Sequence, residues 1–307
     1  MRDVRCDVCG ATSSELFALR PPRTDVLHRR FVRCRECGFV YADPRATAEE
    51  AQRFYESISS RGSGSLASSI GSDEWNDAVA VRRRRLEAGA AALDQNRSIR
   101  FLDVGFGDGT SLAAAAELGW EPYGLEYAEW LVDAARERLG LENLVCGDVA
   151  EAPFEPASFD VVYSWHVVEH VLDLDEWFGA VARILRPGGV LVLGTENADG
   201  LQGKIWRAAF KLSRRTPWPP TSTDHTYWFS CASLRTVALR HDLEPAALSA
   251  YENSPLEIVR GESLARLRNP RWLASLALYL AASTAALIAP RLGGKILLVA
   301  RKQPAIV

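Results

Sequence analysis

The sequence lacks a long hydrophobic run and lacks an excess of charge of either sign. Its apolar uncharged segment at residues 274–289 spans 16 residues, fewer than the roughly 20 that a membrane-spanning helix needs. A net charge of −3 and a pI near 6.0 provide no overall attraction for nucleic acid. The first ten residues contain no apolar signal-peptide core. We therefore expect a cytoplasmic protein with reduced cysteines.

Two local patterns stand out against this background. Residues 274–289 are apolar enough for a buried helix, a lid, a face between two copies of the chain or a peripheral membrane contact. The sequence leaves these alternatives and the oligomeric state open. Four arginines, Arg82 to Arg85, follow one another, and such a run is usually a solvated helix face.

Four of the six cysteines form two pairs of identical spacing near the N-terminus. Two intervening residues let both sulfurs of a pair face one ion, and four thiolates suit tetrahedral zinc. A glycine follows each pair, which permits a left-handed turn around the metal. With four protein ligands the site has no open position, so we predict structural zinc. The ligands are Cys6, Cys9, Cys34 and Cys37.

The order of expected elements predicts an α/β fold with a doubly wound, Rossmann-like sheet of about seven strands and helices on both faces. Strands and helices alternate from residue 99 onward, and such sheets bind ligands where their strands end. The predicted divisions are a zinc-binding module at 1–45, a helical and Ser/Gly-rich connector at 46–97, and a cofactor-binding domain at 98–307 with a lid at about 196–229.

A glycine-rich loop ends the first strand of the predicted sheet. Its glycines are Gly105, Gly107 and Gly109, and they let the backbone approach a nucleoside-bearing cofactor. The next residue is Thr110, so the dinucleotide pattern GxGxxG is not met. This spacing argues against a nicotinamide dehydrogenase.

Acidic residues stand at the ends of three successive strands. Glu126 is placed to accept hydrogen bonds from both hydroxyls of a ribose, and Asp148 from an adenine amino group. Asp103 is placed near an ammonium group. Three carboxylates around a glycine loop suit a cationic sulfonium cofactor without phosphate. Surface charge or a turn role is the alternative for each acid, most of all for Asp148.

Taken together, these motifs resemble the class I, seven-stranded S-adenosylmethionine-dependent methyltransferases. The matching segments are LDVGFGDG, YGLE, GDVAEAPF, FDVVYSWHVVEHV and LRPGGVLVL. A narrower resemblance, to members with an N-terminal CxxCG module, also includes His225 in the segment HTYWFS. The resemblance implies that Trp165 lines the methionine end of the cofactor and that the last strand inserts antiparallel into the sheet. Phe106 departs from the family, which often has a smaller residue there.

Methyl transfer mainly requires alignment of the acceptor atom, the carbon and the sulfur, and a base helps when the acceptor is a hydroxyl or an activated carbon. His225 and His166 are the candidate bases or substrate ligands, whereas His170 is at least as well explained by a structural role. Aromatic residues after His225 either shape an acceptor pocket or anchor the lid.

The resemblance favours a small-molecule acceptor, such as a sugar, a nucleotide-linked sugar or another secondary metabolite. Two alternatives stay open at this point. An RNA methyltransferase would use the zinc module and the arginine run to bind phosphate, although the acidic pI argues against it. A non-catalytic scaffold would retain the fold without the chemistry, although the intact glycine loop and Glu126 argue against that.

Overall fold

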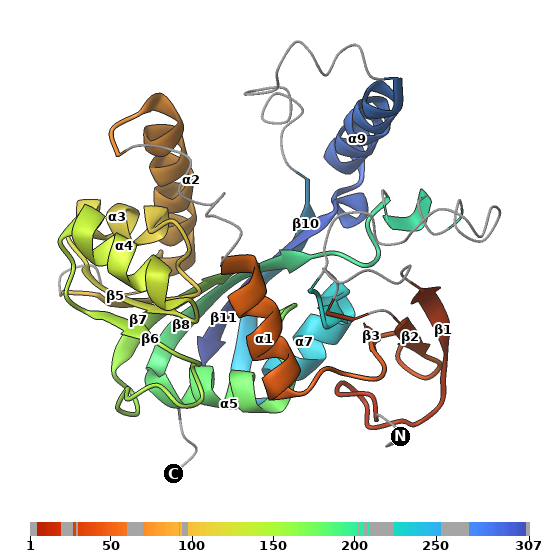
Figure 1. The fold of residues 1–307 in the computed structure, drawn as a ribbon, viewed down its shortest axis with the longest axis horizontal. Coiled ribbons are helices and arrows are strands. Elements are labelled where there is room, and N and C mark those ends of the chain that lie inside the picture. Colours follow the sequence, from red (N-terminus) through yellow and green to blue (C-terminus); the bar gives the residue numbers. More distant parts are fainter. Residues whose placement is uncertain are drawn as a thin grey trace. The chain divides into compact units, whose positions relative to one another are not determined.

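A computed structural model describes most of the chain (Figure 1). The described residues are 5–19, 27–28, 30–59, 70–91, 93, 98–201, 203–205, 208, 224–252 and 270–304. The core of the predicted Ser/Gly-rich connection, 60–69, and much of the predicted lid, 209–223, lie outside them. The chain divides into two compact units. The cysteine unit contains residues 1–45, 195–234 and 248–297, and the cofactor unit contains 46–194, 235–247 and 298–307.

Seven strands form the large sheet in the order β10-β11-β8-β7-β4-β5-β6. Its four pairs from β8 to β6 are parallel, as the alternating pattern predicted. The last strand lies between β10 and β8, which confirms that it inserts into the sheet, and its Ile296, Leu298 and Ala300 are buried. The strands are β4 (Arg100–Val104), β5 (Glu121–Glu126), β6 (Leu144–Cys146), β7 (Phe159–Trp165), β8 (Leu185–Glu196), β10 (Leu243–Tyr251) and β11 (Lys295–Lys302).

The helices begin where the sequence supplies caps. Before α1, the Thr47 amide donates to Glu50 at 2.8 Å and the Glu50 amide donates to the Thr47 hydroxyl at 3.2 Å, so the two residues form a capping box. Ser72 caps α2 by accepting from the Trp75 amide. The helices are α1 (Ala48–Ser59), α2 (Asp73–Ala90), α3 (Thr110–Glu117), α4 (Glu129–Leu139), α5 (Leu174–Ile184), α7 (Cys231–Arg240) and α9 (Pro270–Ile288), with a 3₁₀ turn, η3 (Pro290–Leu292).

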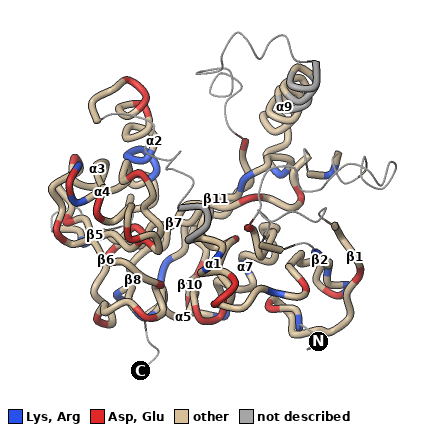
Figure 2. Tube along the Cα trace, in the orientation of Figure 1, with Lys and Arg blue, Asp and Glu red and all other residues tan. Residues whose placement is uncertain are grey.

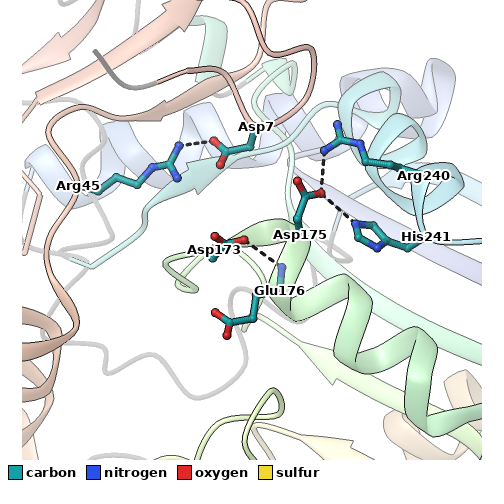
Figure 3. A network of polar contacts seen from close by, with 7 residues as sticks. All are labelled: Asp7, Arg45, Asp173, Asp175, Glu176, Arg240 and His241. Carbon is teal, nitrogen blue, oxygen red and sulfur yellow. Dashed lines mark hydrogen bonds and ion pairs between the residues drawn. The ribbon is translucent and has the colours of Figure 1, made fainter. Parts of the chain in front are cut away.

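A polar network ties the start of α5 to the end of α7 (Figure 3). Asp175 accepts from Arg240 at 2.7 Å and from His241 at 3.0 Å. Although burial raises the pKa of Asp175, its hydrogen bonds to His241 and Arg240 and the Arg240 charge bring that pKa below its ordinary value. Two residues before Asp175, Asp173 caps α5 by accepting a hydrogen bond from the Glu176 amide at 2.9 Å.

A second, four-stranded sheet forms the core of the cysteine unit, in the order β1-β2-β3-β9 with antiparallel pairs throughout. Three strands come from the N-terminus, but the fourth follows His225. Its Trp228 packs edge-on against Phe31 at 4.5 Å between ring centroids, and Tyr227 stacks on Phe39 at 5.7 Å. These aromatics therefore anchor their segment to the N-terminal sheet. The strands are β1 (Ser14–Leu19), β2 (Arg30–Cys34), β3 (Val40–Ala42) and β9 (Tyr227–Trp228).

Helix α9 covers the apolar segment that raised the question of membrane contact. Near its end Leu287 and Ile288 are 77% and 84% exposed, whereas Ala282 and Ala286 are buried. Within the described part of the chain, none of the helices has the length and apolar character needed to cross a bilayer.

Candidate functional site

The four N-terminal cysteines come together in the cysteine unit, as predicted. The sulfur of Cys6 lies 3.5 Å from that of Cys37, and the sulfur of Cys9 lies 3.5 Å from that of Cys34. All four sulfurs lie within 4.8 Å of one another and none forms a disulfide. Tetrahedral zinc with bonds of about 2.3 Å needs sulfurs about 3.8 Å apart, so the donor set and its spacing fit that ion.

Both cysteine turns have the same local geometry. The Gly10 amide donates to the Cys6 carbonyl at 2.7 Å, and the Gly38 amide donates to the Cys34 carbonyl at 3.0 Å. Each glycine has φ of 76°, where a Cβ atom would be strained. This is the role predicted for the glycine after each pair.

An arginine links one cysteine turn to the aromatic core of the same unit. Arg45 forms an ion pair with Asp7, which lies inside the first turn (Figure 3). Its guanidinium also lies over the Tyr227 ring, 5.2 Å from the centroid. The turn that carries two sulfurs is thereby tied to the strand that closes the sheet.

The glycine loop lies at the carboxyl end of β4 in the cofactor unit. All three glycines have positive φ: 78° at Gly105, 52° at Gly107 and 83° at Gly109. A Cβ atom on Gly105 would lie 2.3 Å from a methyl of Val167, and one on Gly109 would lie 2.7 Å from a methyl of Leu139. The loop therefore needs glycine for conformation at all three positions and for space at two of them.

Glu126 organises this loop through its carboxylate. One oxygen accepts from the Gly107 amide at 3.0 Å. The other accepts from the amides of Tyr127 at 2.8 Å and Ala128 at 3.3 Å. Burial raises the pKa of Glu126, and these three amides oppose the rise. Ribose contact stays a prediction. The structure adds a second role, because the carboxylate also holds the loop that would surround the nucleoside.

Asp103 is a buried carboxyl group, 2% exposed, just before the glycine loop. The Ser111 hydroxyl from α3 donates to its Oδ2. Its Oδ1 has no hydrogen-bond partner among the described residues. Burial is the main cause that raises the pKa of Asp103 to about 7, with the Glu126 charge adding to the rise and Arg82 opposing it. A cationic ligand beside Oδ1 would stabilise the ionised form.

Asp148 and Phe106 are the two remaining residues that the sequence associated with the cofactor. Asp148 is exposed and accepts from the Ala150 amide at 2.9 Å, so it forms the turn that was its alternative explanation. Its adenine contact stays a prediction. The Phe106 ring packs against Gly124 of β5, where a Cβ atom would lie 2.7 Å away. The glycine in YGLE therefore makes space for the residue that departs from the family pattern.

Trp165 ends β7 at the same edge of the sheet as the glycine loop, and His166 follows it directly. The Trp165 ring lies directly on Gly194 of β8, where a Cβ atom would approach it to 2.4 Å. His166 has φ of 57°, an unusual conformation for a side-chain-bearing residue. Its Nδ1 lies 2.8 Å from a carboxylate oxygen of the fully buried Glu169. This pairing fixes the orientation of the ring. The role of His166 as a base or substrate ligand stays a prediction.

The second predicted base, His225, belongs to the cysteine unit. It is buried directly before β9, with its ring 5.4 Å from that of Trp228. Its role as a base or substrate ligand stays a prediction.

Sequence analysis did not identify Glu169 or the contacts of Arg85. The spacing of Glu169 three residues after His166 was the available signal, but the irregular turn that brings them together has no periodic pattern. Arg85 reaches the site from α2, which is distant in sequence. Its guanidinium carbon lies 3.8 Å from the centroid of the Trp165 ring.

Comparisons with known proteins agree with this geometry. Residues 102–193 match a family model described as a methyltransferase domain. A probable S-adenosylmethionine-dependent methyltransferase of Mycolicibacterium smegmatis is 31% identical over 166 residues, 54% of this chain and 57% of that protein. A ubiquinone biosynthesis O-methyltransferase of Ruegeria pomeroyi is 39% identical over 163 residues, 52% of this chain and 65% of that protein. The chain spans less than two thirds of either relative's length.

Among solved structures, a complex of the Haloferax volcanii Trm112 methyltransferase activator with a putative methyltransferase matches with a TM-score of 0.52 and 18% identity. The match covers 77% of this chain and 100% of that chain. It supports the fold. Together with the family match and the strand order, it shows that residues 102–193 resemble a methyltransferase domain and that the large sheet has the Rossmann-like fold of such domains.

Proposed function

We propose that the chain transfers a methyl group from S-adenosylmethionine to a small-molecule acceptor. The observation that carries the proposal is the loop of three positive-φ glycines, which Glu126 holds through the Gly107 amide. Beside the loop lies the buried Asp103, of which one carboxylate oxygen has no hydrogen-bond partner among the described residues. Such a loop admits a nucleoside, and the carboxylates suit the hydroxyls and the positive charges of this cofactor. The bound cofactor would supply a methyl group on a positively charged sulfur.

In the proposed mechanism, this chain's residues align the acceptor and remove its proton. Glu169 accepts a hydrogen bond from Nδ1 of His166, which favours the tautomer with an unprotonated Nε2. Nε2 takes the proton from an acceptor hydroxyl or activated carbon as the methyl group arrives.

The acceptor class rests on the resemblance and on the absence of a large positive surplus. A net charge of −3 does not favour a polyanionic substrate. A sugar, a nucleotide-linked sugar or another secondary metabolite remains the proposed class. The Ruegeria relative is named for ubiquinone biosynthesis, so an aromatic or lipid-linked hydroxyl is equally within the proposed chemistry.

We also propose that the cysteine cluster holds structural Zn²⁺. Four thiolates leave no position for substrate, so the ion would support folding of the cysteine unit. Cys6, Cys9, Cys34 and Cys37 are the proposed ligands, and the sulfur spacing supports them.

The decisive experiment transfers tritiated methyl groups from labelled S-adenosylmethionine into a clarified extract of the host. Size fractionation and nuclease treatment then sort the labelled products. Label in small, nuclease-resistant species supports the proposal and supplies the fraction in which to identify the acceptor. Label in nuclease-sensitive polymer would favour an RNA methyltransferase. A protein that binds the cofactor and labels nothing in extracts from several growth conditions would favour a scaffold.

A further inference from the structure

Helix α2 carries four consecutive arginines, and the structure divides them into two faces. Arg83 and Arg84 are exposed, and Arg83 pairs with Glu87 at 3.2 Å on the helix surface. Arg82 and Arg85, one turn apart, are half-buried. Figure 2 shows the acidic start of α2 followed by its basic stretch. The run is therefore only partly the solvated face that the sequence predicted.

Contacts within the cofactor unit fix where the half-buried face points. Gly89 of α2 packs directly on Val192 of β8, where a Cβ atom would lie 2.4 Å from a methyl. One turn earlier, the Arg85 guanidinium lies on the Trp165 ring at 3.8 Å. Such a cation–π contact holds the guanidinium plane in place at modest cost. Arg82 follows one further turn toward the start of the helix.

Below this arginine face, two buried polar atoms lack partners among the described residues. They are Oδ1 of Asp103 and the hydroxyl of Tyr163, each on a residue only 2% exposed. The two residues are directly opposite each other in the parallel pairing of β4 with β7, so their side chains share one face of the sheet. Buried polar groups left unpaired cost free energy, and such a pair commonly marks the place of a ligand.

Electrostatics agrees with this arrangement. Burial raises the pKa of Tyr163 to about 12, and the Arg85 and Arg82 charges oppose the rise. Arg85 therefore lies close to the Tyr163 hydroxyl, and a side-chain contact between the two also opposes the rise of that pKa. The Arg82 charge also acts on Asp103. One negative group, one neutral hydroxyl and two positive groups thus surround one position beside the glycine loop.

The chemistry of this position matches a zwitterion. An α-amino acid carries an ammonium and a carboxylate on one carbon, so it needs an anionic acceptor and cationic donors close together. We propose that Arg82 and Arg85 of α2 bind the carboxylate of the cofactor's amino-acid end, with the Tyr163 hydroxyl as a further donor and Asp103 Oδ1 receiving the ammonium. This inference rests on the proposed function and extends it to a subsite built by α2.

The test compares two ligands that differ only at that end. S-adenosylhomocysteine carries the amino acid, whereas 5′-methylthioadenosine has the same nucleoside and a thioether without it. Titration calorimetry measures both against the wild-type chain and against Arg82→Met, Arg85→Met and their double variant. Arg84→Met is the matched control, because it removes the same charge from the exposed face of the same helix.

We expect each single variant to weaken S-adenosylhomocysteine binding by about tenfold or more and the double variant by about 100-fold, as for lost charge-assisted hydrogen bonds. Binding of 5′-methylthioadenosine should change by less than about threefold, and Arg84→Met should leave both ligands unaffected. Equal losses for both ligands, or no loss for either, would overturn the inference. Thermal unfolding without ligand identifies any variant that is merely destabilised.

A second comparison needs no variant at all. The methyl ester of S-adenosylhomocysteine removes the negative charge of the carboxylate, so the wild-type chain should bind it at least about tenfold more weakly than the free acid. Equal affinity would refute the carboxylate subsite while leaving the proposed function intact. A wild-type chain that binds none of the three ligands would refute the cofactor class itself, and the subsite with it.

Discussion

The cysteine cluster and the cofactor edge of the large sheet are both polar centres, but they differ in how their groups are partnered. Each sulfur of the cluster has another within 3.5 Å, in a space that suits a single ion. At the cofactor edge, Asp103 Oδ1 and the Tyr163 hydroxyl have no partners among the described residues. The difference matches the two proposals, in which one small ion would complete the first centre and a ligand with several polar groups would complete the second.

The largest expected effect is a loss of zinc binding that leaves cofactor binding intact. Cys34→Ser removes one of four zinc ligands, and we expect bound zinc to fall from about one per chain to near zero, because structural zinc is bound cooperatively with folding. Zinc content by mass spectrometry and protection of the β1–β3 amides from hydrogen exchange measure this loss. S-adenosylhomocysteine affinity should persist. Cys146→Ser, an exposed cysteine outside the cluster, is the control. Simultaneous loss of zinc and cofactor binding would mean that the two centres fold as one.

The next effect concerns catalysis at the cofactor edge. His166→Asn keeps a residue type that tolerates positive φ but removes the base, so methyl transfer should fall by about 100- to 10,000-fold. Affinity for S-adenosylhomocysteine should change little. Glu169→Gln should cause a smaller loss and move the pH profile, because the amide no longer favours the same tautomer. Unchanged transfer by His166→Asn would remove His166 from the mechanism and leave His225 as the candidate base.

Cofactor affinity should respond to Glu126 by a smaller factor. Glu126→Ala removes a carboxylate that holds three loop amides and that we expect to contact ribose. Binding should weaken by about 1–3 kcal/mol, or roughly 10- to 100-fold. Calorimetry with S-adenosylhomocysteine measures this, and the exposed Glu129→Ala serves as control. If the dissociation constant stays the same, Glu126 is misassigned.

The smallest effect is a pH dependence confined to the cofactor edge. With a pKa of about 7 in the unliganded protein, Asp103 would be only about one-tenth ionised at pH 6. An ammonium needs the ionised form, so affinity for S-adenosylhomocysteine should fall by up to about tenfold between pH 8 and pH 6. Asp103→Asn should bind more weakly at pH 8 and lose this dependence. A wild-type affinity that is flat over this range would contradict the assignment.

The raised pKa of Asp103 also affects the stability of the unliganded protein. Here a lower pH strengthens the folded state, whereas it weakens ligand binding. Because the folded-state pKa of Asp103 lies above the ordinary value of 3.8, the folded chain binds a proton more readily than the unfolded chain. The contribution of Asp103 to the free energy of unfolding therefore increases as the pH falls from 7 toward 4. Denaturant unfolding of the wild type and Asp103→Asn, compared at pH 7 and pH 5, measures the difference.

The two centres were also unequally predictable from sequence. The cysteine ligands follow from spacing alone, because both halves of the site are short turns. The strands around the glycine loop follow from alternation and from loop glycines, and β4 ends directly before that loop, as predicted. The carboxylates at strand ends were identified for the same reason. Local rules of this kind need no knowledge of tertiary contacts.

Contacts between distant segments were not predictable in the same way. The buried positions of α2 direct Arg84 away from the sheet, but nothing in the sequence indicates that Arg85 meets the Trp165 ring. The segment after His225 gave an aromatic cluster but no indication that it pairs with β3. A two-residue strand has too little pattern to predict a partner near the opposite end of the chain.

The pairing of β9 with β3 has a consequence for how the protein is made. The ribosome makes the four cysteines before residues 227–228, so the proposed metal ligands emerge before the sheet is complete. Residues 227–228, which complete the same sheet, emerge roughly ten to forty seconds later at ordinary elongation rates. During that interval Phe31 and Val40 lack the Trp228 ring that covers them in the finished core. A nascent chain would thus carry a half-covered apolar sheet during that interval, which makes metal capture and chaperone contact matter most for this part of the molecule.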